Sequence, residues 1–581
     1  MAGVALGALT GFGAVTHYAV DPLGEVPYLP DAAPKGGEKG GIVRIVAAKG
    51  EYEPGSFVLV SDTDLGKVQL EIGEFKREEG RGKRDEGTGE VIFPKDKIDL
   101  KTVKVWYQAG TAWYSYFGDS GLKLCPELLL NDEDLVRVDR VKRTNYARLT
   151  AKDGTVSYRW LNPSPALETR HEDVARYYPA TGSFDCMKED FSDAKAFAGA
   201  TLAKGEHKQF FLTVHVTKDI PAGLYRGEIK VKSKSEKVKG EVASVPVALR
   251  VLDFELPGPK CYYDCTKDYD THMCQYVGLR QVMDLNGNDR ELGERQLTEI
   301  LRHFVAHGET IPGYRDARKH PEWGRAAGQD FTKVGAGTMH LGAVVESRYQ
   351  ARRLKERMTR QFGWHRPLAT WGDEFKLETL RNIRGMVEAY GELGFRFQVN
   401  SRYGYQAAAY LADLWWPPYS PDFTSAPETA KYNEAMGFTG SFGWYASQHV
   451  GVENPAFCRR QYGFGPYRAG FGCNYNYAHH LCGWNDLTDG YRSMMLVYGT
   501  GDGCVDTLAY EGLREGLDDI RYATKLKMLA EPLAGSENLA QRYAARKALQ
   551  LLADANTDDM DLTTLRLEMI GHIEKLIALG K

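Results

Sequence analysis

The sequence predicts a multidomain protein in which an N-terminal antiparallel β-sandwich is followed by an α/β (β/α)8 TIM-like barrel and C-terminal helices. Three observations predict this fold class. Short β-branched or alternating segments fill the first part of the chain, apolar strands alternate with helical patterns after residues 257–259 (Pro-Gly-Pro), and helical periodicity continues after Thr507. A length of 581 residues also exceeds one ordinary domain.

We place the domain boundaries where the character of the sequence changes. Residues 1–20 are a possible signal remnant or disordered start, 21–258 the sandwich, 259–530 the barrel, and 531–581 C-terminal helices packed on the barrel.

The sandwich is predicted from short segments that alternate or are rich in β-branched residues, separated by glycine, proline and runs of charge. Residues 118–200 lack this pattern and are expected to form an irregular excursion. The strand segments lie at residues 41–46, 56–60, 101–106, 209–216 and 245–252.

The barrel is predicted from about seven or eight strand and helix units, an arrangement typical of this fold. Apolar residues at helical spacing predict a helix over 288–307, with Gly308 as its stop. Further helices are expected from Tyr510, over 536–555 and over 562–579, as packing elements. The expected strands lie near residues 261–263, 309–311, 368–371, 395–400, 441–445, 470–474 and 494–498.

The overall composition excludes several classes of partner. The hydrophobic share is 43%, the charged share 26% and the net charge −4, so neither nucleic acid nor an anionic membrane is an expected partner. No run is long and apolar enough to span a bilayer. Residues 2–16 resemble the later part of a secretory signal without its positive start, which favours a secreted or periplasmic protein, otherwise a cytoplasmic one.

The nine cysteines show no disulfide-framework spacing. Cys261, Cys265 and Cys274 lie near His272, which suggests zinc, but the spacing matches no usual zinc pattern. Structural cysteines or a local disulfide are the favoured interpretation. We expect no metal site and no cofactor.

A pair of adjacent carboxylates, Asp373 and Glu374, follows the strand pattern at 368–371 and Gly372, and a helical pattern begins at Leu377. In a (β/α)8 barrel the carboxyl ends of the strands line the active site. Two neighbouring carboxylates raise each other's pKa, so one can stay protonated and act as a general acid. The alternative is an N-cap that only stabilises the start of the following helix.

Aromatic, amide and cationic side chains recur at successive strand ends. Each residue alone fits a core or turn position, but their recurrence indicates a sugar pocket, where rings form apolar platforms and polar groups fix the hydroxyls. The candidates for substrate binding are Trp371, Asn400, Arg402, Tyr403, Trp444, Tyr445, Asn474, Tyr475, Asn476 and Trp484.

Several segments together resemble glycoside hydrolase family 123 and its uncharacterised relatives. They are residues 47–54 (AAKGEYEP), 219–229 (DIPAGLYRGEI), 251–257 (VLDFELP), the Asp373-Glu374 pair, and 511–519 (EGLREGLDD). The resemblance implies a sandwich followed by a barrel, no cofactor, and a glycan as substrate.

The same resemblance implies an exo-acting β-N-acetylgalactosaminidase that retains configuration by substrate-assisted catalysis. Glu374 would be the acid and base. Asp373 would orient the 2-acetamido group, whose oxygen attacks the anomeric carbon, and would stabilise the oxazolinium intermediate. An adjacent acid pair then suffices, because the substrate itself supplies the nucleophile.

Three alternatives stay open. The first is a non-catalytic carbohydrate-binding protein on a barrel scaffold, with the acidic pair tied to arginines such as Arg381 or Arg402. The second is a glycosidase that acts on a different sugar. The third is a glycosidase with its own nucleophile, which places a residue such as Asp413 or Glu378 about 5 Å from Glu374.

Overall fold

The structure is a computed structural model. It describes residues 15–78, 91–109, 122–161, 186–234, 238–275, 277–312, 320–329, 339–340, 348–362, 368–370, 378, 385, 389–400, 414–416, 441–445, 454–480, 484, 495–555 and 561–580. Residues 1–14 lie outside this set, so export stays a prediction. Within the described residues, no helix combines the length and the apolar character that crossing a membrane requires.

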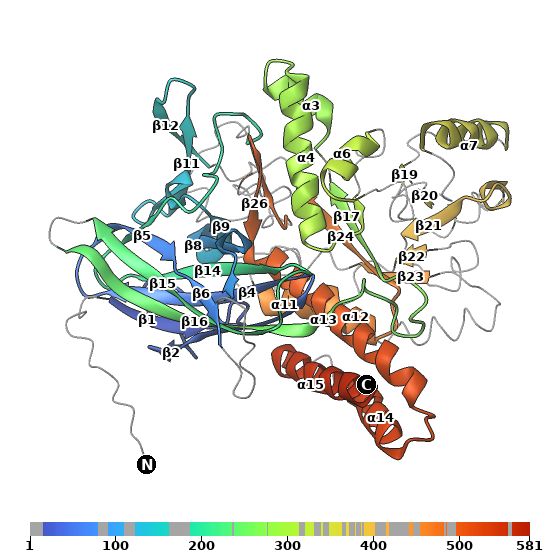
Figure 1. Cartoon of the computed structure of the whole chain (residues 1–581). Coiled ribbons are helices and arrows are strands. Elements are labelled where there is room, and N and C mark those ends of the chain that lie inside the picture. Colours follow the sequence, from blue (N-terminus) through green and yellow to red (C-terminus); the bar gives the residue numbers. More distant parts are fainter. Residues whose placement is uncertain are drawn as a thin grey trace, which may run out of the picture. The chain divides into compact units, whose positions relative to one another are not determined.

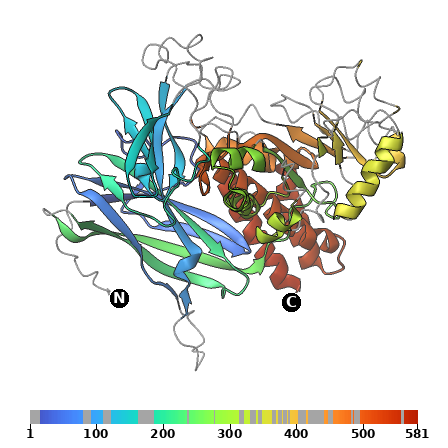
Figure 2. The ribbon, with the colours of Figure 1, turned by 90° about the horizontal axis from the view of Figure 1, so that it is seen from above.

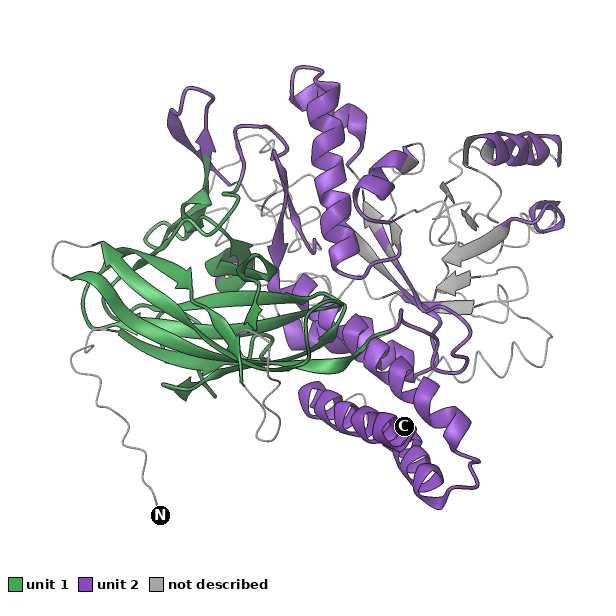
Figure 3. Cartoon of the chain, viewed as in Figure 1, with its two compact units in different colours: residues 1–107, 124–148, 193–256 green, residues 108–123, 149–192, 257–581 purple. Residues whose placement is uncertain are grey.

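The chain forms two compact units (Figure 3). Unit 1 comprises residues 1–107, 124–148 and 193–256, and unit 2 comprises residues 108–123, 149–192 and 257–581. The last change of unit comes between Leu256 and Pro257, at the start of the Pro-Gly-Pro sequence.

The sandwich of unit 1 consists of two β-sheets that pack against each other (Figures 1 and 2). Pairing within them is antiparallel except that β16 and β3 run parallel. The first sheet has the order β2 (Glu38–Lys39), β1 (Val15–Val20), β4 (Glu51–Ser61), β14 (His207–Val216), β8 (Ile98–Ala109) and β9 (Leu122–Leu130). The second has the order β13 (Ala200–Leu202), β5 (Gly66–Ile72), β15 (Gly223–Lys234), β16 (Lys239–Glu255) and β3 (Val43–Lys49), with β6 (Phe75–Arg77) on β15 and β7 (Ile92–Phe93) on β6.

The two sheets share one hydrophobic core, as a sandwich requires. Residues Phe57 and Phe210 of the first sheet belong to the same buried cluster as Ile45 and Val247 of the second. Phe57 and Phe210 are register partners, and their stacked rings lie 5.3 Å apart. In β3 the buried and exposed side chains alternate from Val43, which is the pattern that predicted a strand here. The antiparallel sheets and the five predicted strands are confirmed.

The expectation of an irregular segment over residues 118–200 is wrong in part. Strands β9, β10 (Val136–Asp139), β11 (Thr144–Thr150) and β12 (Val156–Trp160) lie inside it, and β10 and β11 form a hairpin. The segment of β9 reads LKLCPELLL, where a proline and a glutamate interrupt the apolar run. Glu127 is nevertheless buried, and its carboxylate accepts a hydrogen bond from the Trp106 ring at 2.6 Å. Tertiary pairing therefore overrides a weak local pattern.

Unit 2 contains one eight-stranded sheet of parallel strands. Its order is β18 (Ile311–Pro312), β17 (Asp270–Gln275), β24 (Cys473–His480), β23 (Ser441–Tyr445), β22 (Leu414–Trp416), β21 (Arg396–Asn400), β20 (Leu368–Thr370) and β19 (Met339–His340).

The strand order is that of a ring opened at one place. The first strand in sequence, β17, pairs with both the second, β18, and the last, β24. Among the residues that the structure describes, β18 and β19 do not pair, so the described strands form a curled, open sheet where a closed barrel was expected. Edge strands β18 and β19 have only two residues each, which limits the pairing that each can make.

Two predicted barrel strands are wrong. The first barrel strand is β17, not residues 261–263, which lie in a turn where the Asp264 amide donates to the Cys261 carbonyl. The predicted strand at 494–498 is represented only by its last residue, Tyr498, in β25 (Tyr498–Thr500), which forms an antiparallel hairpin with β26 (Gly503–Thr507). Both segments are apolar and β-branched or aromatic, a composition that does not distinguish a strand from a buried turn or hairpin.

Helices lie between and after the strands of unit 2. The predicted helix over 288–307 is confirmed as α4, where Asp289 caps the first turn and Gly308 takes a positive φ of 76° at the end. The C-terminal helices are confirmed too. The set comprises α3 (Leu279–Leu285), α4 (Arg290–Ala306), α6 (Pro321–Ala326), α7 (Arg348–Phe362), α11 (Pro455–Arg459), a π-helical turn (Arg460–Phe464), α12 (Gly465–Arg468), α13 (Leu508–Ala530), α14 (Leu539–Asp554) and α15 (Leu562–Gly580).

Helix α13 is buried along most of its length and is the central helix of unit 2. Gly512 and Gly516, one turn apart, face the backbone of the α11 segment. A Cβ at Gly512 would collide with the carbonyl oxygen of Pro455, and one at Gly516 with the carbonyl of Arg459. These two glycines therefore permit a backbone contact that any larger residue would prevent.

We expect the substitution Gly512→Ala to destabilise the protein although alanine is the better helix former. Overpacking costs about 1–3 kcal/mol and should lower the midpoint of thermal unfolding by roughly 3 °C or more. The matched control is Gly571→Ala in α15, where the added Cβ meets open space. It should raise the midpoint slightly, and an equal rise for Gly512→Ala would contradict the close-contact interpretation.

Candidate functional site

The predicted acidic pair follows a confirmed strand of the parallel sheet. Strand β20 ends at Thr370, three residues before Asp373 in the sequence. Asp373 and Glu374 themselves lie outside the described residues, as do Trp371, Arg402 and Tyr403. The roles assigned to these residues stay predictions.

Other predicted binding residues lie at the ends of parallel strands or level with the end of a neighbouring strand. Asn400 is the last residue of β21 and Tyr445 the last of β23, and Tyr445 is the register partner of Tyr475 in β24. Asn476 follows in the same strand. Because the strands run parallel, their carboxyl ends meet at one edge of the sheet, so the backbone brings these positions to the edge toward which β20 also runs.

Three of the predicted binding residues have the contacts of core residues. Trp444, Asn474 and Trp484 are 0, 1 and 2% exposed. Trp444 packs edge-on against Phe471 at 5.5 Å, and the Asn474 amide donates to the carbonyl of Tyr462. These contacts fit the packing role that a single strand-end residue usually has.

Trp484 is held by both its ring and its nitrogen. Its Nε1–H donates to the Gly499 carbonyl at 2.7 Å, and its ring contacts those of Phe191 and Tyr498, with centroids at 4.9 and 5.1 Å. We therefore leave Trp444, Asn474 and Trp484 out of the proposed sugar pocket.

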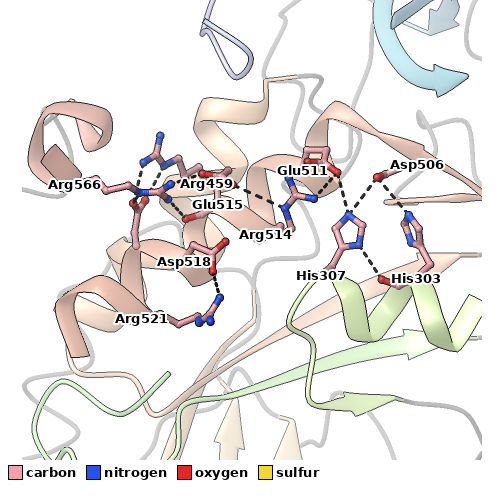
Figure 4. Close-up of polar contacts among 11 residues, drawn as sticks. His303, His307, Arg459, Asp506, Glu511, Arg514, Glu515, Asp518, Arg521 and Arg566 are labelled. Atoms are coloured by element: carbon pink, nitrogen blue, oxygen red, sulfur yellow. Dashed lines mark hydrogen bonds and ion pairs between the residues drawn. The ribbon is translucent and has the colours of Figure 1, made fainter. Parts of the chain in front are cut away.

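A second polar site is fully described, and it lies at the start of α13 (Figure 4). It consists of His303, His307, Asp506 and Glu511, which we call the histidine–carboxylate cluster. His303 is in the last turn of α4 and His307 caps that helix, so their spacing of four residues puts both on one face. Asp506 comes from the end of β26, and Glu511 from the first turn of α13.

One carboxylate oxygen joins the two histidines. Asp506 Oδ2 lies 3.3 Å from His303 Nε2 and 3.2 Å from His307 Nε2. Glu511 Oε1 lies 3.3 Å from the same His307 nitrogen. The other ring nitrogen of His307, Nδ1, is 2.9 Å from the His303 carbonyl, so we assign the donating N–H there.

Burial and charge oppose each other within the cluster. Burial alone would lower the pKa of His307, but Asp506 and Glu511 outweigh it and raise that pKa to about 9. Burial alone would raise the pKa of Asp506, but His307 and His303 hold it well below its usual range. Burial raises the pKa of Glu309, two residues after His307, to about 7. These are strongly interacting groups in a water-poor interior.

A ladder of buried ion pairs continues from the cluster along α13 (Figure 4). Arg514 pairs with Glu511, and Arg566 of α15 pairs with both Glu515 and Asp519. Arg459 of α11 binds Asp519 through two bonds of 2.7 and 2.8 Å. The 511–519 segment is therefore a packing element, as the sequence predicted, and in addition it carries a series of buried ion pairs.

The cysteine and histidine group near residue 261 does not form a disulfide between its described members. Cys261 is buried, and its thiol donates to the Asp268 carbonyl at 3.3 Å. Among the described residues, Cys261 and Cys265 are not linked to each other. The side chains of His272 and Cys274 lie outside the described set, so the zinc alternative there is untested.

An antiparallel sandwich, a curled parallel α/β sheet and a set of C-terminal helices together define the fold of the chain. A family 123 glycoside hydrolase from Clostridium perfringens, studied for glycolipid glycan hydrolysis, has the same fold, with a TM-score of 0.63 over 98% of this chain and 100% of that chain at 11% identity. The resemblance predicted from sequence is confirmed at the level of the fold.

Two further solved structures share little with the chain. AvmM, which catalyses macrocyclization in alchivemycin A biosynthesis, gives a TM-score of 0.16 at 9% identity, over 37% of this chain and 85% of its own. The N-terminal domain of PorA gives a TM-score of 0.13 at 10% identity, over 42% of this chain and 99% of its own. Neither score supports an argument. No protein-family model and no curated protein sequence matches the chain.

Sequence reasoning missed the histidine–carboxylate cluster. Its one local signal is the His-x3-His spacing of His303 and His307, which is a common ligand spacing on helices. Asp506 comes some 200 positions later in the sequence, so only the fold brings it to the histidines.

We expect the substitution Arg566→Leu to destabilise unit 2 strongly, because it leaves Glu515 and Asp519 buried with less positive charge. Breaking a buried pair costs about 3–5 kcal/mol, and the midpoint of thermal unfolding should fall by roughly 10 °C. The matched control removes an exposed helical pair by Arg280→Leu next to Asp284. That change should cost less than about 1 kcal/mol, and equal effects of the two variants would contradict the buried-ladder account.

Proposed function

We propose that the protein is an exo-acting glycoside hydrolase that removes β-linked N-acetylgalactosamine with retention of configuration. The observation that carries the proposal is the fold, which is shared over 98% of the chain with a family 123 glycoside hydrolase. In addition, β20 of the parallel sheet leads directly into the sequence Trp-Gly-Asp-Glu. Active sites of parallel α/β sheets lie at the carboxyl ends of the strands.

In the proposed mechanism, the general acid and the residue that orients the 2-acetamido group are neighbours in the sequence. Glu374 donates its proton to the leaving glycosidic oxygen and then removes a proton from the attacking water. Asp373 accepts a hydrogen bond from the N–H of the 2-acetamido group and balances the positive charge of the oxazolinium ion. The carbonyl oxygen of the substrate forms the bond to the anomeric carbon as the leaving oxygen departs.

The proposed substrate-binding residues within the parallel sheet come from β21, β23 and β24. Asn400 and Tyr445 close two strands of the sheet, and Tyr475 and Asn476 lie in the strand next to that of Tyr445. Amides can bind sugar hydroxyls, and rings can lie against the apolar face of a sugar. Trp371, Arg402 and Tyr403 complete the proposed set. A glycolipid or other glycoconjugate is the proposed source of the glycan.

We expect Glu374→Gln to lower kcat/KM on a substrate with a poor leaving group by about 10²–10⁴-fold, because proton donation is lost. With a leaving group that departs without protonation, the variant should regain most of the lost rate of the glycosylation step. Kinetics on two aryl N-acetylgalactosaminides of different leaving-group acidity measure both effects. Glu392→Gln changes an exposed glutamate that pairs with Arg348 and should leave turnover unchanged.

We expect Asp373→Asn to lower turnover and also to weaken the binding of a thiazoline analogue of the cyclic intermediate. A neutral amide cannot balance the positive charge of that intermediate. Wild-type turnover in both Asp373→Asn and Glu374→Gln would contradict the mechanism. Loss of turnover in Asp413→Asn or Glu378→Gln, with Asp373→Asn fully active, would instead indicate an enzyme-borne nucleophile.

We expect hydrolysis only of substrates that carry a 2-acetamido group. A panel of aryl glycosides with and without that group measures this directly, and turnover of the 2-hydroxy sugars at an equal rate would contradict substrate assistance. Glycan binding without hydrolysis of any member would instead indicate a carbohydrate-binding protein.

A further inference from the structure

We propose that His303, His307 and Asp506 bind a divalent transition-metal ion, most suitably zinc, at a structural site in unit 2. One possible ligand atom of each residue lies within 4.8 Å of the other two, and the proposed ligand atoms are His303 Nε2, His307 Nε2 and Asp506 Oδ2. Glu511 or a water molecule supplies the fourth position. The proposal does not rest on the proposed glycosidase activity.

The ligand set suits zinc by its chemistry. Neutral imidazole nitrogen and carboxylate oxygen are common zinc ligands, and structural zinc sites are usually tetrahedral. The two histidines are on one helical face, and the carboxylate comes from a different part of the chain. A metal ion here would link the end of α4 to the segment that leads into α13.

The distances within the cluster fit a shared metal ion better than direct hydrogen bonds. Hydrogen bonds between a charged nitrogen and a carboxylate are about 2.7–2.9 Å long. The separations here are 3.2 Å for His307 Nε2 to Asp506 Oδ2, and 3.3 Å for both His303 Nε2 to Asp506 Oδ2 and His307 Nε2 to Glu511 Oε1. Zinc–ligand bonds of roughly 2.0–2.1 Å give a tetrahedral edge of about 3.3 Å. Small rotations of the two imidazoles would bring their Nε2 atoms to a similar separation from each other.

The groups behind the ligands hold them in the required orientation. His307 Nδ1 donates to the His303 carbonyl at 2.9 Å, which leaves Nε2 as the lone-pair atom that faces Asp506. Asp506 Oδ1 accepts from the Thr507 amide at 2.7 Å, which leaves Oδ2 for the metal. Metal-binding histidines and carboxylates are commonly fixed by such second hydrogen bonds. The Tyr510 ring stacks on His307 with centroids 3.9 Å apart.

The local charge also accommodates a dication. Asp506 contributes one negative charge, while Glu511 is balanced by Arg514. Glu309 is a further carboxyl, 1% exposed and close enough to His307 for the two to interact electrostatically. With both histidines bound as neutral ligands, the carboxylate of Asp506 would offset part of the charge of the zinc ion.

The competing account needs no metal. In that account His307 is protonated and pairs directly with Asp506, which also satisfies the charge of the carboxylate. The two accounts differ in metal stoichiometry and in the response of the protein to a chelator, and both are measurable on the full chain.

The test uses full-length protein without a histidine tag, stripped with a chelator and titrated with Co²⁺ as a spectroscopic probe. We expect about one Co²⁺ per chain, visible absorption of a tetrahedral N and O site, displacement by Zn²⁺, and a higher midpoint of thermal unfolding with metal than without. Asp506→Asn and His303→Gln should each reduce the stoichiometry to below about 0.2. His320→Gln removes a histidine that pairs with Glu322 outside the cluster and should bind Co²⁺ like the wild type.

Three results would overturn the proposal. The stripped wild type could bind no Co²⁺ and show no thermal shift, the Co²⁺ spectrum could show thiolate charge-transfer bands, or folded Asp506→Asn protein could bind as much metal as the wild type. If the variants do not fold, the wild-type titration decides alone, since its stoichiometry and spectrum do not depend on them.

Discussion

The packing of unit 2 depends on a single buried carboxylate, that of Asp519. Arg459 from α11 and Arg566 from α15 both bind it, so one side chain on α13 joins three helices. Charges this deeply buried are tolerated only when their partners are already in place, because removing either ion from water costs several kcal/mol. The contact also requires Gly512 and Gly516, which let the α11 segment approach the backbone of α13. The charge pairs and the two glycines therefore act together to hold the α11 segment and α15 against α13. The pairing explains why residues 511–519 contain so many buried ionisable groups.

Sequence reasoning succeeded where local chemistry sets the limits of an element. Helix α4 and the three C-terminal helices carry full helical periodicity with caps such as Asp289 and Thr507, so their limits follow from local chemistry. The strands of the sandwich alternate with period two, and their buried sides form one core. Strand β9 was missed because proline and glutamate interrupt its apolar run, and the buried glutamate, Glu127, accepts a hydrogen bond from Trp106 of the neighbouring strand β8.

The candidate site, too, could be predicted from the sequence only in part. A run of side chains at strand ends can be read from the sequence, because parallel strands place their carboxyl ends together. Whether a given side chain faces a pocket or the core cannot be read, since Trp444 and Trp484 look like sugar platforms and are core residues. The histidine–carboxylate cluster shows the opposite failure. His303 and His307 lie one turn apart at the end of α4, but the cluster also needs Asp506, which only the fold brings near them.

The proposed function joins a fold shared with a glycoside hydrolase to an acidic pair that follows a parallel strand in the sequence. It differs from an ordinary two-carboxylate glycosidase in one chemical respect, because the substrate's own amide forms the first bond to the anomeric carbon. Two successive displacements on that carbon preserve its configuration. Proton NMR of the first sugar released from a β-linked N-acetylgalactosaminide measures this most directly. The account predicts that the β-anomer accumulates first and then mutarotates, whereas initial release of the α-anomer would contradict it.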